Sequence, residues 1–298
     1  MLIISDGILV ISIVSMLFVI NRIQPLNKVE EKIVDSKAFD NLNLQAKSVY
    51  VFDILKNKAI YEKNQSEIMP LASLTKLMMA LTAVRLFPKD SKITIKKEFL
   101  KEEGDNGLLA GENWKLKGLL DFSLITSSND GARSVASVVG AMDLKSDDYV
   151  LGRKDFIEKM NDTARAIGLN QTYYINESGL DEGDRNGGYS SAEDVAKLIN
   201  YILINKPELL ESTKYPMTKI DSLNKSHTAK NTNIELSQIP NLLASKTGYT
   251  DLAGGNLVVA FDLSIGHPII AVVLGSTEKG RFSDVKQLVK ASLDYVQQ

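Results

Sequence analysis

Three short motifs carry the residues whose types and spacing could do chemistry. They are Ser73-Leu74-Thr75-Lys76, Ser127-Ser128-Asn129 and Lys246-Thr247-Gly248, in that order along a chain of 298 residues. A serine hydroxyl becomes a good nucleophile only when a neighbouring base takes its proton, and a lysine is such a base when its amine is neutral. Burial and a second nearby cation both lower the pKa of a lysine. Together the motifs indicate a serine hydrolase that works without histidine.

The first motif is specific only because of its surroundings. Ser73 is followed by an apolar run from Leu74 to Phe87 that predicts a buried helix, in which residues three apart share a face. Lys76 is therefore expected beside the Ser73 hydroxyl, and the free N–H groups of the helix start favour an oxyanion there. The alternative is that Ser73 only caps a helix. The bare Ser-x-x-Lys pattern also occurs at Ser222/Lys225, Ser276/Lys279 and Ser283/Lys286.

The second motif follows a helix-like segment, 119 to 126, and precedes another that extends to Ala141. Its short polar residues predict a turn between two helices. Ordinary turn chemistry explains such residues equally well, and Ser222-Leu223-Asn224 matches Ser-x-Asn too.

The third motif lies in a strand-like segment, Leu242 to Tyr249, followed by two apolar strands, 257 to 263 and 268 to 274. An ammonium and a hydroxyl side by side suit a ligand that carries a carboxylate. Gly248 lets a ligand backbone come close to the strand edge. If the motifs converge, Lys246 is the second cation near Lys76.

At this point the chain resembles the D-alanyl-D-alanine carboxypeptidases of the low-molecular-mass penicillin-binding protein family, from about residue 45 to the C-terminus. The blocks that carry the resemblance, in family order, are Pro70 to Lys76, Gly111-Glu112, Ser128-Asn129-Asp130, Asn176 to Leu180, Asn231-Thr232-Asn233 and Lys246 to Thr250. Ser245 stands where the family pattern usually has Gly.

The resemblance implies a role for each matching residue. Ser73 would attack the carbonyl between two D-alanines and form an acyl-enzyme, with Lys76 taking its proton. Ser127 would relay a proton to the departing amine, and Asn129 would hold Lys76 and the substrate amide. The substrate-binding set would be Lys246, Thr247, Gly248 and Tyr249: the first two bind the terminal carboxylate, and the N–H groups of Ser73 and Tyr249 form the oxyanion hole. The resemblance implies no metal or organic cofactor.

The element order predicts an α+β fold. Early strands between 47 and 61 must join the late strands, with helices between them, which indicates an antiparallel sheet flanked by helices and a separate helical lobe. The resembled DD-peptidase and β-lactamase-like fold has this arrangement, with the active site at the lobe boundary. An amphipathic pattern predicts a closing helix from Asp284 to Val296.

Composition excludes several other classes. The net charge of −2 argues against a nucleic-acid partner, and the absence of cysteine excludes thiolate metal sites, disulfides and cysteine nucleophiles. The two histidines, His227 and His267, are expected to be solvated loop residues, and no Gly-x-Ser-x-Gly context supports a Ser-His-Asp triad.

Three segments are expected along the chain. Residues 1 to 20 are mostly apolar and long enough to cross a bilayer, which favours an uncleaved membrane anchor over a cleaved signal peptide. Residues 21 to 44 are a polar linker, and residues 45 to 298 are the catalytic domain. Arg22 and Lys28 follow the apolar segment, which by the charge rule favours a cytoplasmic domain. The implied substrate, the peptidoglycan stem peptide, requires the extracytoplasmic side.

Rival functions stay open at the level of sequence. A crosslink-cleaving endopeptidase would differ from a carboxypeptidase only in the space that the site leaves for substrate beyond the leaving D-alanine. A serine β-lactamase needs a residue that activates water, and Glu177 is the one candidate in the matching neighbourhood. A silent peptidoglycan-binding module would not need the complete set of catalytic residues. β-Lactams are expected as covalent inhibitors in the favoured reading.

Overall fold

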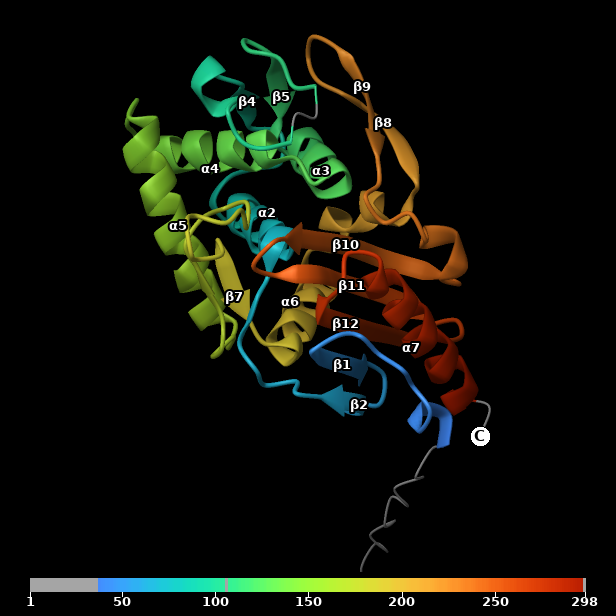
Figure 1. Ribbon diagram of the computed structural model, residues 1–298. Helices are drawn as coiled ribbons and strands as arrows, with labels where there is room; N and C mark the ends of the chain where they lie inside the picture. The colour runs from blue at the N-terminus through green and yellow to red at the C-terminus, as the bar shows by residue number, and fades with distance from the viewer. Residues whose placement is uncertain (1–36, 105–106, 297–298) are drawn as a thin grey trace, which may run out of the picture. The chain divides into compact units, whose positions relative to one another are not determined.

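Five antiparallel strands form the central sheet of the computed structural model, which describes residues 37–104 and 107–296. The strands lie in the order β10-β11-β12-β1-β2, so the first two strands of the sheet pair beside the last, as Figure 1 shows. Their bounds are β1 Ser48–Asp53, β2 Lys58–Lys63, β10 Leu242–Thr250, β11 Gly254–Asp262 and β12 Pro268–Ser276. The expected antiparallel sheet, built from early and late strands, is confirmed.

Helices cover both faces of this sheet. Alternate residues of β1 point to opposite sides: Tyr50 packs in the cluster that includes helix α2 (Thr75–Leu86) and helix α6 (Ala192–Asn205). Val49 and Val51 pack in the cluster under helix α7 (Gly280–Val296). Because both faces are covered, β11 and β12 are apolar almost without interruption, where an exposed sheet face would show alternating polar residues.

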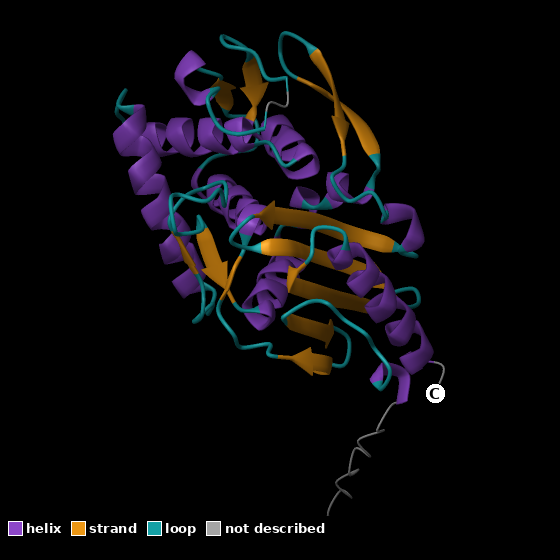
Figure 2. Cartoon of the chain, viewed as in Figure 1, coloured by secondary structure: helices purple, strands orange, loops and turns teal. Residues whose placement is uncertain are grey.

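A second group of helices forms the predicted lobe beside the sheet, as Figure 2 shows by the concentration of purple ribbon on one side. Its helices are α3 (Leu116–Thr126), α4 (Asn129–Asp143) and α5 (Tyr149–Ala166). The small strands are β3 Met69–Pro70, β4 Lys92–Thr94, β5 Asn113–Lys115, β6 Tyr173–Tyr174, β7 Gly188–Ser190, β8 Met217–Asp221 and β9 Ser226–Lys230. The 3-10 turns are η1 Lys37–Phe39, η2 Ala72–Leu74, η3 Lys97–Phe99, η4 Pro207–Leu209, η5 Glu211–Lys214 and η6 Leu236–Gln238.

The helices that carry the motifs lie close to where the sequence places them. The predicted helix 74–87 is α2, the segment 119–126 is the end of α3, and the helix through Ala141 is α4. The closing helix α7 begins at Gly280, four residues before the predicted start. Gly280 and Arg281 are buried there, although neither is a large apolar residue that would extend the amphipathic pattern.

The expectation for the two histidines is wrong. His227 and His267 are buried, and the Nε2 atoms lie 2.5 Å from Glu112 Oε1 and 2.8 Å from Asp53 Oδ2. A carboxylate partner satisfies the imidazole in the interior, and no local pattern indicates this because the partners are 115 and 214 residues away. Ser222 Oγ also donates to Glu112 rather than to His227, so this cluster is no catalytic triad.

The first part of the chain divides differently from the sequence expectation. Residues 1–36 and 37–298 are separate units, and 37–44 belongs to the second. There Phe39 stacks on Tyr61 with ring centres 5.4 Å apart, and Asn43 N donates to Gln287 Oε1. The proposed anchor, 1–20, lies outside the described residues, as does the linker up to residue 36. Within 37–104 and 107–296, no helix has the length and apolar character to cross a bilayer.

Two glycines allow α4 and α5 to touch backbone to backbone. A Cβ on Gly140 would lie 1.9 Å from the carbonyl oxygen of Gly152, and a Cβ on Gly152 would lie 2.3 Å from Ala141 N. Neither obstacle is a flexible side chain, so the helices must separate to accept even a methyl group.

We expect Gly140→Ala to lower the free energy of unfolding by at least about 2 kcal/mol, because it overpacks this contact. Gly118→Ala is the matched control: it is also helical, but its Cβ would meet no atom closer than 3.6 Å. Gly118→Ala should leave the free energy of unfolding unchanged or raise it by up to about 1 kcal/mol, because alanine has the higher helix propensity. Urea unfolding of both variants measures the difference, and equal effects would contradict the packing argument.

Candidate active site

Ser73 and Lys76 meet at the entry to α2. Ser73 lies in the 3-10 turn η2, and Lys76 lies in the first turn of α2, so their side chains share one face. Lys76 Nζ lies 2.9 Å from Ser73 Oγ, and Lys76 has no exposed surface. The proximity predicted from the three-residue spacing is therefore present.

The Lys76 amine has two further partners, from two other parts of the chain. Nζ donates to Asn129 Oδ1 at 2.6 Å and to the carbonyl oxygen of Ser178 at 2.8 Å. A neutral amine has two N–H groups and one lone pair. With its two hydrogens on Asn129 and Ser178, the lone pair faces Ser73 Oγ, which is the arrangement that a base needs.

Burial lowers the pKa of Lys76 to about 7, although the negative charges of Glu177 and Glu102 act in the opposite direction. An ammonium in this position loses most of its hydration, which favours the neutral form. At neutral pH the amine is therefore divided between its two protonation states. A lysine with its ordinary pKa would be almost fully protonated.

Lys246 reaches the same site from the edge strand β10. Its Nζ donates to Ser127 Oγ at 2.9 Å and to the carbonyl of Thr247 at 2.8 Å. Burial lowers the pKa of Lys246 well below its ordinary value, and the charges of Lys76 and Arg281 lower it further. The structure thus brings the three motifs together: α2, the turn between α3 and α4, and β10.

A row of hydroxyl and amide groups extends from Thr247 away from Ser73. Thr247 Oγ1 lies 2.5 Å from Thr232 Oγ1, and Asn233 Nδ2 donates to Ser245 Oγ at 2.8 Å. Ser245 N in turn donates to Thr213 Oγ1. Ser245, which replaces the usual Gly, therefore anchors the segment that carries Thr232 against β10.

Gly248 brings β10 against the amide of the nucleophile. A Cβ at residue 248 would lie 2.8 Å from Leu71 O and 3.2 Å from Ser73 N, so only glycine fits. The Gly248 carbonyl accepts a hydrogen bond of 2.6 Å from the buried Arg281 guanidinium. The next residue, Tyr249, is 45% exposed and borders the site.

Two residues at the site have a left-handed backbone. Ala72 has φ +48° and Ser127 has φ +60°, values that non-glycine residues seldom adopt. Asn186 holds the first by accepting a hydrogen bond from Ala72 N while donating to the Gly179 carbonyl. Such local strain persists only where the surroundings fix it, and it is typical of functional sites.

The loop with Glu177 adjoins the site, because the carbonyl of the next residue, Ser178, accepts a hydrogen bond from Lys76 Nζ. Glu177 is buried, and Arg153 Nε donates to both of its carboxylate oxygens, at 3.0 and 2.9 Å. The Arg153–Glu177 pair holds this loop in place, and the Ser178 carbonyl in the same loop contacts Lys76. Glu177 is therefore placed as a structural residue and not as a base for a hydrolytic water.

A cavity of about 420 Å³ opens beside Tyr249, and its wall includes Leu180 and the acidic residues Glu103, Asp181 and Asp251. The Glu103 carbonyl accepts a hydrogen bond from Asn129 Nδ2, so this cavity adjoins the catalytic groups.

Sequence reasoning missed the roles of three contacts. The Ser178 carbonyl is a backbone group, which no motif reveals. The Asn231-Thr232-Asn233 pattern does not indicate the contact of Thr232 with Thr247. Arg281, in the first turn of α7, lies 33 residues from the Gly248 carbonyl that it binds. A basic residue at the start of a helix gives no signal of its own.

Several known proteins are similar to this chain. The profile of a family described as D-alanyl-D-alanine carboxypeptidase matches residues 34–278. The D-alanyl-D-alanine carboxypeptidase DacF of Bacillus subtilis is 29% identical over 265 residues, which are 86% of this chain and 64% of that protein. A D-alanyl-D-alanine endopeptidase of Escherichia coli is 27% identical over 252 residues, 81% of this chain and 75% of that protein.

Solved structures agree on the fold. Penicillin-binding protein D2 of Listeria monocytogenes, in its ampicillin-bound form, superposes with a TM-score of 0.72 at 28% identity, covering 84% of this chain and 98% of that one. The Streptomyces K15 DD-transpeptidase, in a cysteine-to-alanine mutant form, gives a TM-score of 0.76 at 24% identity, covering 87% of this chain and all of that one. The latter likeness concerns the fold alone.

We expect the rate of Ser73 acylation by benzylpenicillin to follow the neutral fraction of Lys76. With a pKa of about 7, the rate rises about fivefold between pH 6 and pH 7 and less than about twofold between pH 7 and pH 8. Stopped-flow measurement of acylation across this range gives the profile. Lys76→Arg keeps a cation that does not deprotonate, and it should lose about 10² to 10⁴ in rate. A flat profile in the wild type would exclude Lys76 as the base.

Proposed function

The chain belongs to the D-alanyl-D-alanine carboxypeptidase family of serine peptidases, and we propose that it removes the terminal D-alanine of peptidoglycan stem peptides through an acyl-enzyme on Ser73. The observation that carries the proposal is the contact of Ser73 Oγ with the buried Lys76 amine. The chain spans 64% of the length of its Bacillus relative, so the activity is proposed for the domain that contains this site.

In the first step, Ser73 Oγ attacks the carbonyl carbon between the two D-alanines while its proton passes to Lys76 Nζ. The N–H groups of Ser73 and Tyr249 stabilise the oxyanion, a kind of contact worth about 3 to 4 kcal/mol per donor. The approach of Gly248 to Ser73 N supports this assignment, because it places the two backbone segments side by side.

Collapse of the tetrahedral intermediate breaks the amide bond, and the leaving amine takes a proton relayed by Ser127 Oγ. The hydrogen bond from Lys246 Nζ fixes the position of this hydroxyl. Asn129 holds Lys76 through its Oδ1, and water then attacks the acyl ester and regenerates the Ser73 hydroxyl.

The carboxylate of the leaving D-alanine binds Lys246 and Thr247. An anion beside Lys246 raises the pKa of its amine back toward the ordinary range, so a carboxylate substrate is bound together with the charged form of Lys246. A substrate without that negative charge would leave the buried Lys246 and Lys76 amines with no anion to offset the repulsion between their charged forms. This difference supports selection for a free C-terminus.

A DD-endopeptidase acting on peptidoglycan crosslinks is the second candidate. Two proteins named D-alanyl-D-alanine endopeptidase, from Haemophilus influenzae and E. coli, are 29% and 27% identical to this chain. The chemistry at Ser73 is the same for both activities. A β-lactamase is less well supported, because Arg153 occupies both oxygens of Glu177.

We propose further that residues 1 to 20 anchor the protein in the cell membrane, with the catalytic domain outside the cytoplasm. Support comes from the apolar run of about the length that crosses a bilayer and from a substrate class found outside the cell. β-Lactams should acylate Ser73, as the ampicillin-bound form of the Listeria protein suggests by similarity.

We expect benzylpenicillin to add one molecule per chain to the wild type and none to Ser73→Ala, measured as intact mass. Ser283→Ala is the matched control: it lies in another Ser-x-x-Lys pattern, is exposed, and should be acylated like the wild type. Rapid loss of the drug without a lasting adduct would point to a β-lactamase.

The wild type and Ser73→Ala also distinguish the carboxypeptidase from the endopeptidase activity. Release of D-alanine from a pentapeptide, lost in Ser73→Ala, supports the carboxypeptidase. Cleavage of a crosslinked dimer without D-alanine release would assign the endopeptidase instead, and no turnover of either substrate by the wild type would overturn the proposed function.

Thr247→Val keeps the shape of the side chain and removes the hydroxyl. We expect kcat/KM for a peptide with a free C-terminal carboxylate to fall by about 10- to 100-fold, because one hydrogen bond to a charged group is lost. The same peptide with a C-terminal amide should respond much less. Thr228→Val, at an exposed position of β9, is the control and should leave both substrates unaffected.

A further inference from the structure

Four segments meet at the end of the sheet that lies away from the catalytic groups. They are the β1–β2 turn, the β11–β12 turn, the last turn of α7 and η1, and Figure 1 shows them at one end of the described domain. Ile54 N donates to Pro268 O at 3.1 Å, which joins the two turns. Lys56 Nζ lies 3.4 Å from the Tyr295 hydroxyl, and the Tyr295 and Phe39 rings are 6.4 Å apart. We call this region the distal end.

Large aliphatic side chains project into solvent from the distal end. Ile265, in the β11–β12 turn, is 105% exposed relative to a free residue, and Leu55, in the β1–β2 turn, is 63% exposed. Val296, at the end of α7, is also exposed. A single exposed aliphatic residue is ordinary, but three on adjoining segments form an apolar tip that water solvates poorly.

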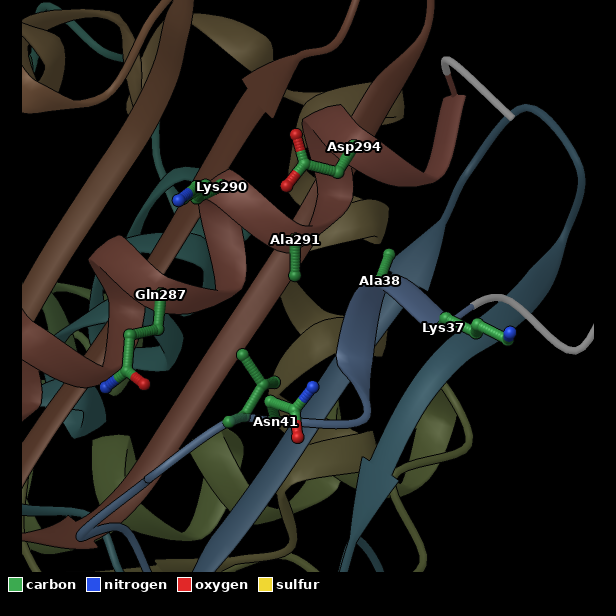
Figure 3. A pocket seen from close by; sticks show the side chains of 8 residues that line it. Lys37, Ala38, Asn41, Gln287, Lys290, Ala291 and Asp294 are labelled. Atoms are coloured by element: carbon green, nitrogen blue, oxygen red, sulfur yellow. The ribbon is translucent and has the colours of Figure 1, made fainter.

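Lysines surround this apolar tip. Lys37 lies in η1, Lys56 in the β1–β2 turn, Lys58 at the start of β2 and Lys290 in α7. The exposed carboxylates of Asp40 and Asp294 lie on the same stretches of chain as Lys37 and Lys290. None of the four lysines forms an ion pair with another described residue. A hollow of about 390 Å³ between η1 and α7 is lined by residues that include Lys37, Asn41, Lys290 and Asp294. Figure 3 shows these side chains. Apolar side chains amid lysines are typical of surfaces that contact anionic lipid.

The described domain begins at this same end. Its first residue, Lys37, is in η1, and the proposed anchor ends at residue 20. The 16 residues between them, 21 to 36, reach at most about 55 Å when fully extended. An anchored chain therefore keeps the distal end within reach of the bilayer.

We propose that the distal end is a membrane-docking surface, whose occupant is the anionic phospholipid surface of the membrane in which the chain is anchored. Leu55 and Ile265 enter the boundary between headgroups and acyl chains, and the surrounding lysines contact lipid phosphates. The inference rests on the membrane location given under the proposed function and does not depend on the reaction at Ser73.

Another exposed apolar group is less suited to this role. Val150 and Leu151, in the first turn of α5, are exposed, but Asp147 and Asp148 lie two to four residues before them. An anionic surface would repel these carboxylates, and this end of α5 is in the helical lobe.

Docking of the distal end would set the direction of the active site. Lys246 and Gly248 lie toward the opposite end of β10 from Leu242, which pairs with Phe261 near the β11–β12 turn. At about 3.4 Å per residue, the six residues from Leu242 to Gly248 alone separate the two ends by about 20 Å. The catalytic groups would then face away from the bilayer, toward the polymer that carries the stem peptides.

The chain has no cysteine, so a single introduced cysteine can be labelled without other changes. The full chain is reconstituted in vesicles that contain phosphatidylglycerol, with an environment-sensitive fluorophore at Leu55→Cys or Ile265→Cys. We expect both labels to brighten severalfold and to be quenched by lipids that carry a quencher in the acyl chain. Leu223→Cys is the matched control, because Leu223 is a similarly exposed leucine in the β8–β9 turn and should report water.

Each other outcome has its own meaning. Protein that floats with the vesicles while the labels at 55 and 265 report water overturns the docking surface and leaves the anchor intact. Equal quenching at 55, 265 and 223 overturns it too, because contact would lack a preferred face. Protein that does not float at all removes the premise of an anchor and the docking surface with it. Benzylpenicillin adducts measured in the same samples test the reaction at Ser73 separately.

Discussion

The burial of the Lys76 amine is the constraint on which the rest of the site depends. An isolated ammonium is too costly to bury in an apolar helix, and the structure lowers that cost by shifting its pKa to about 7 and by supplying acceptors from α4 and from the Glu177 loop. The same contacts aim the lone pair of the neutral amine at Ser73. Stability of the buried lysine and its proposed use as a base therefore have one physical origin.

The polar groups around this lysine act mainly to hold the backbone. Asn186 fixes the left-handed Ala72, Arg153 fixes the loop of Glu177, and Asn233 fixes Ser245 on the edge strand. Each of these side chains is engaged by a partner distant in sequence, so hydrogen bonds hold together the separate parts of the chain that form the site. Preorganised N–H groups and hydroxyls need no rearrangement when charge develops on the substrate.

The central sheet connects the active site to the proposed docking surface. Its long antiparallel strands carry the Lys246 motif toward one end and the exposed Leu55 and Ile265 turns at the other. Helices α6 and α7 pack on its two faces, and its strands connect the two ends directly. In such a domain, docking at one end would orient the active site at the other end without a conformational change.

The sequence by itself determined the helix at Ser73, the turn at Ser127, the strand at Lys246 and the antiparallel α+β fold, because these depend on local hydrophobic patterns and on one-turn spacing. Its block order also identified the family. Only the tertiary structure decided the Ser178 carbonyl beside Lys76, the Thr232 hydroxyl beside Thr247 and the burial of both histidines. These contacts join residues 15 to 214 positions apart, and no local pattern records which distant polar groups will satisfy each other in the interior.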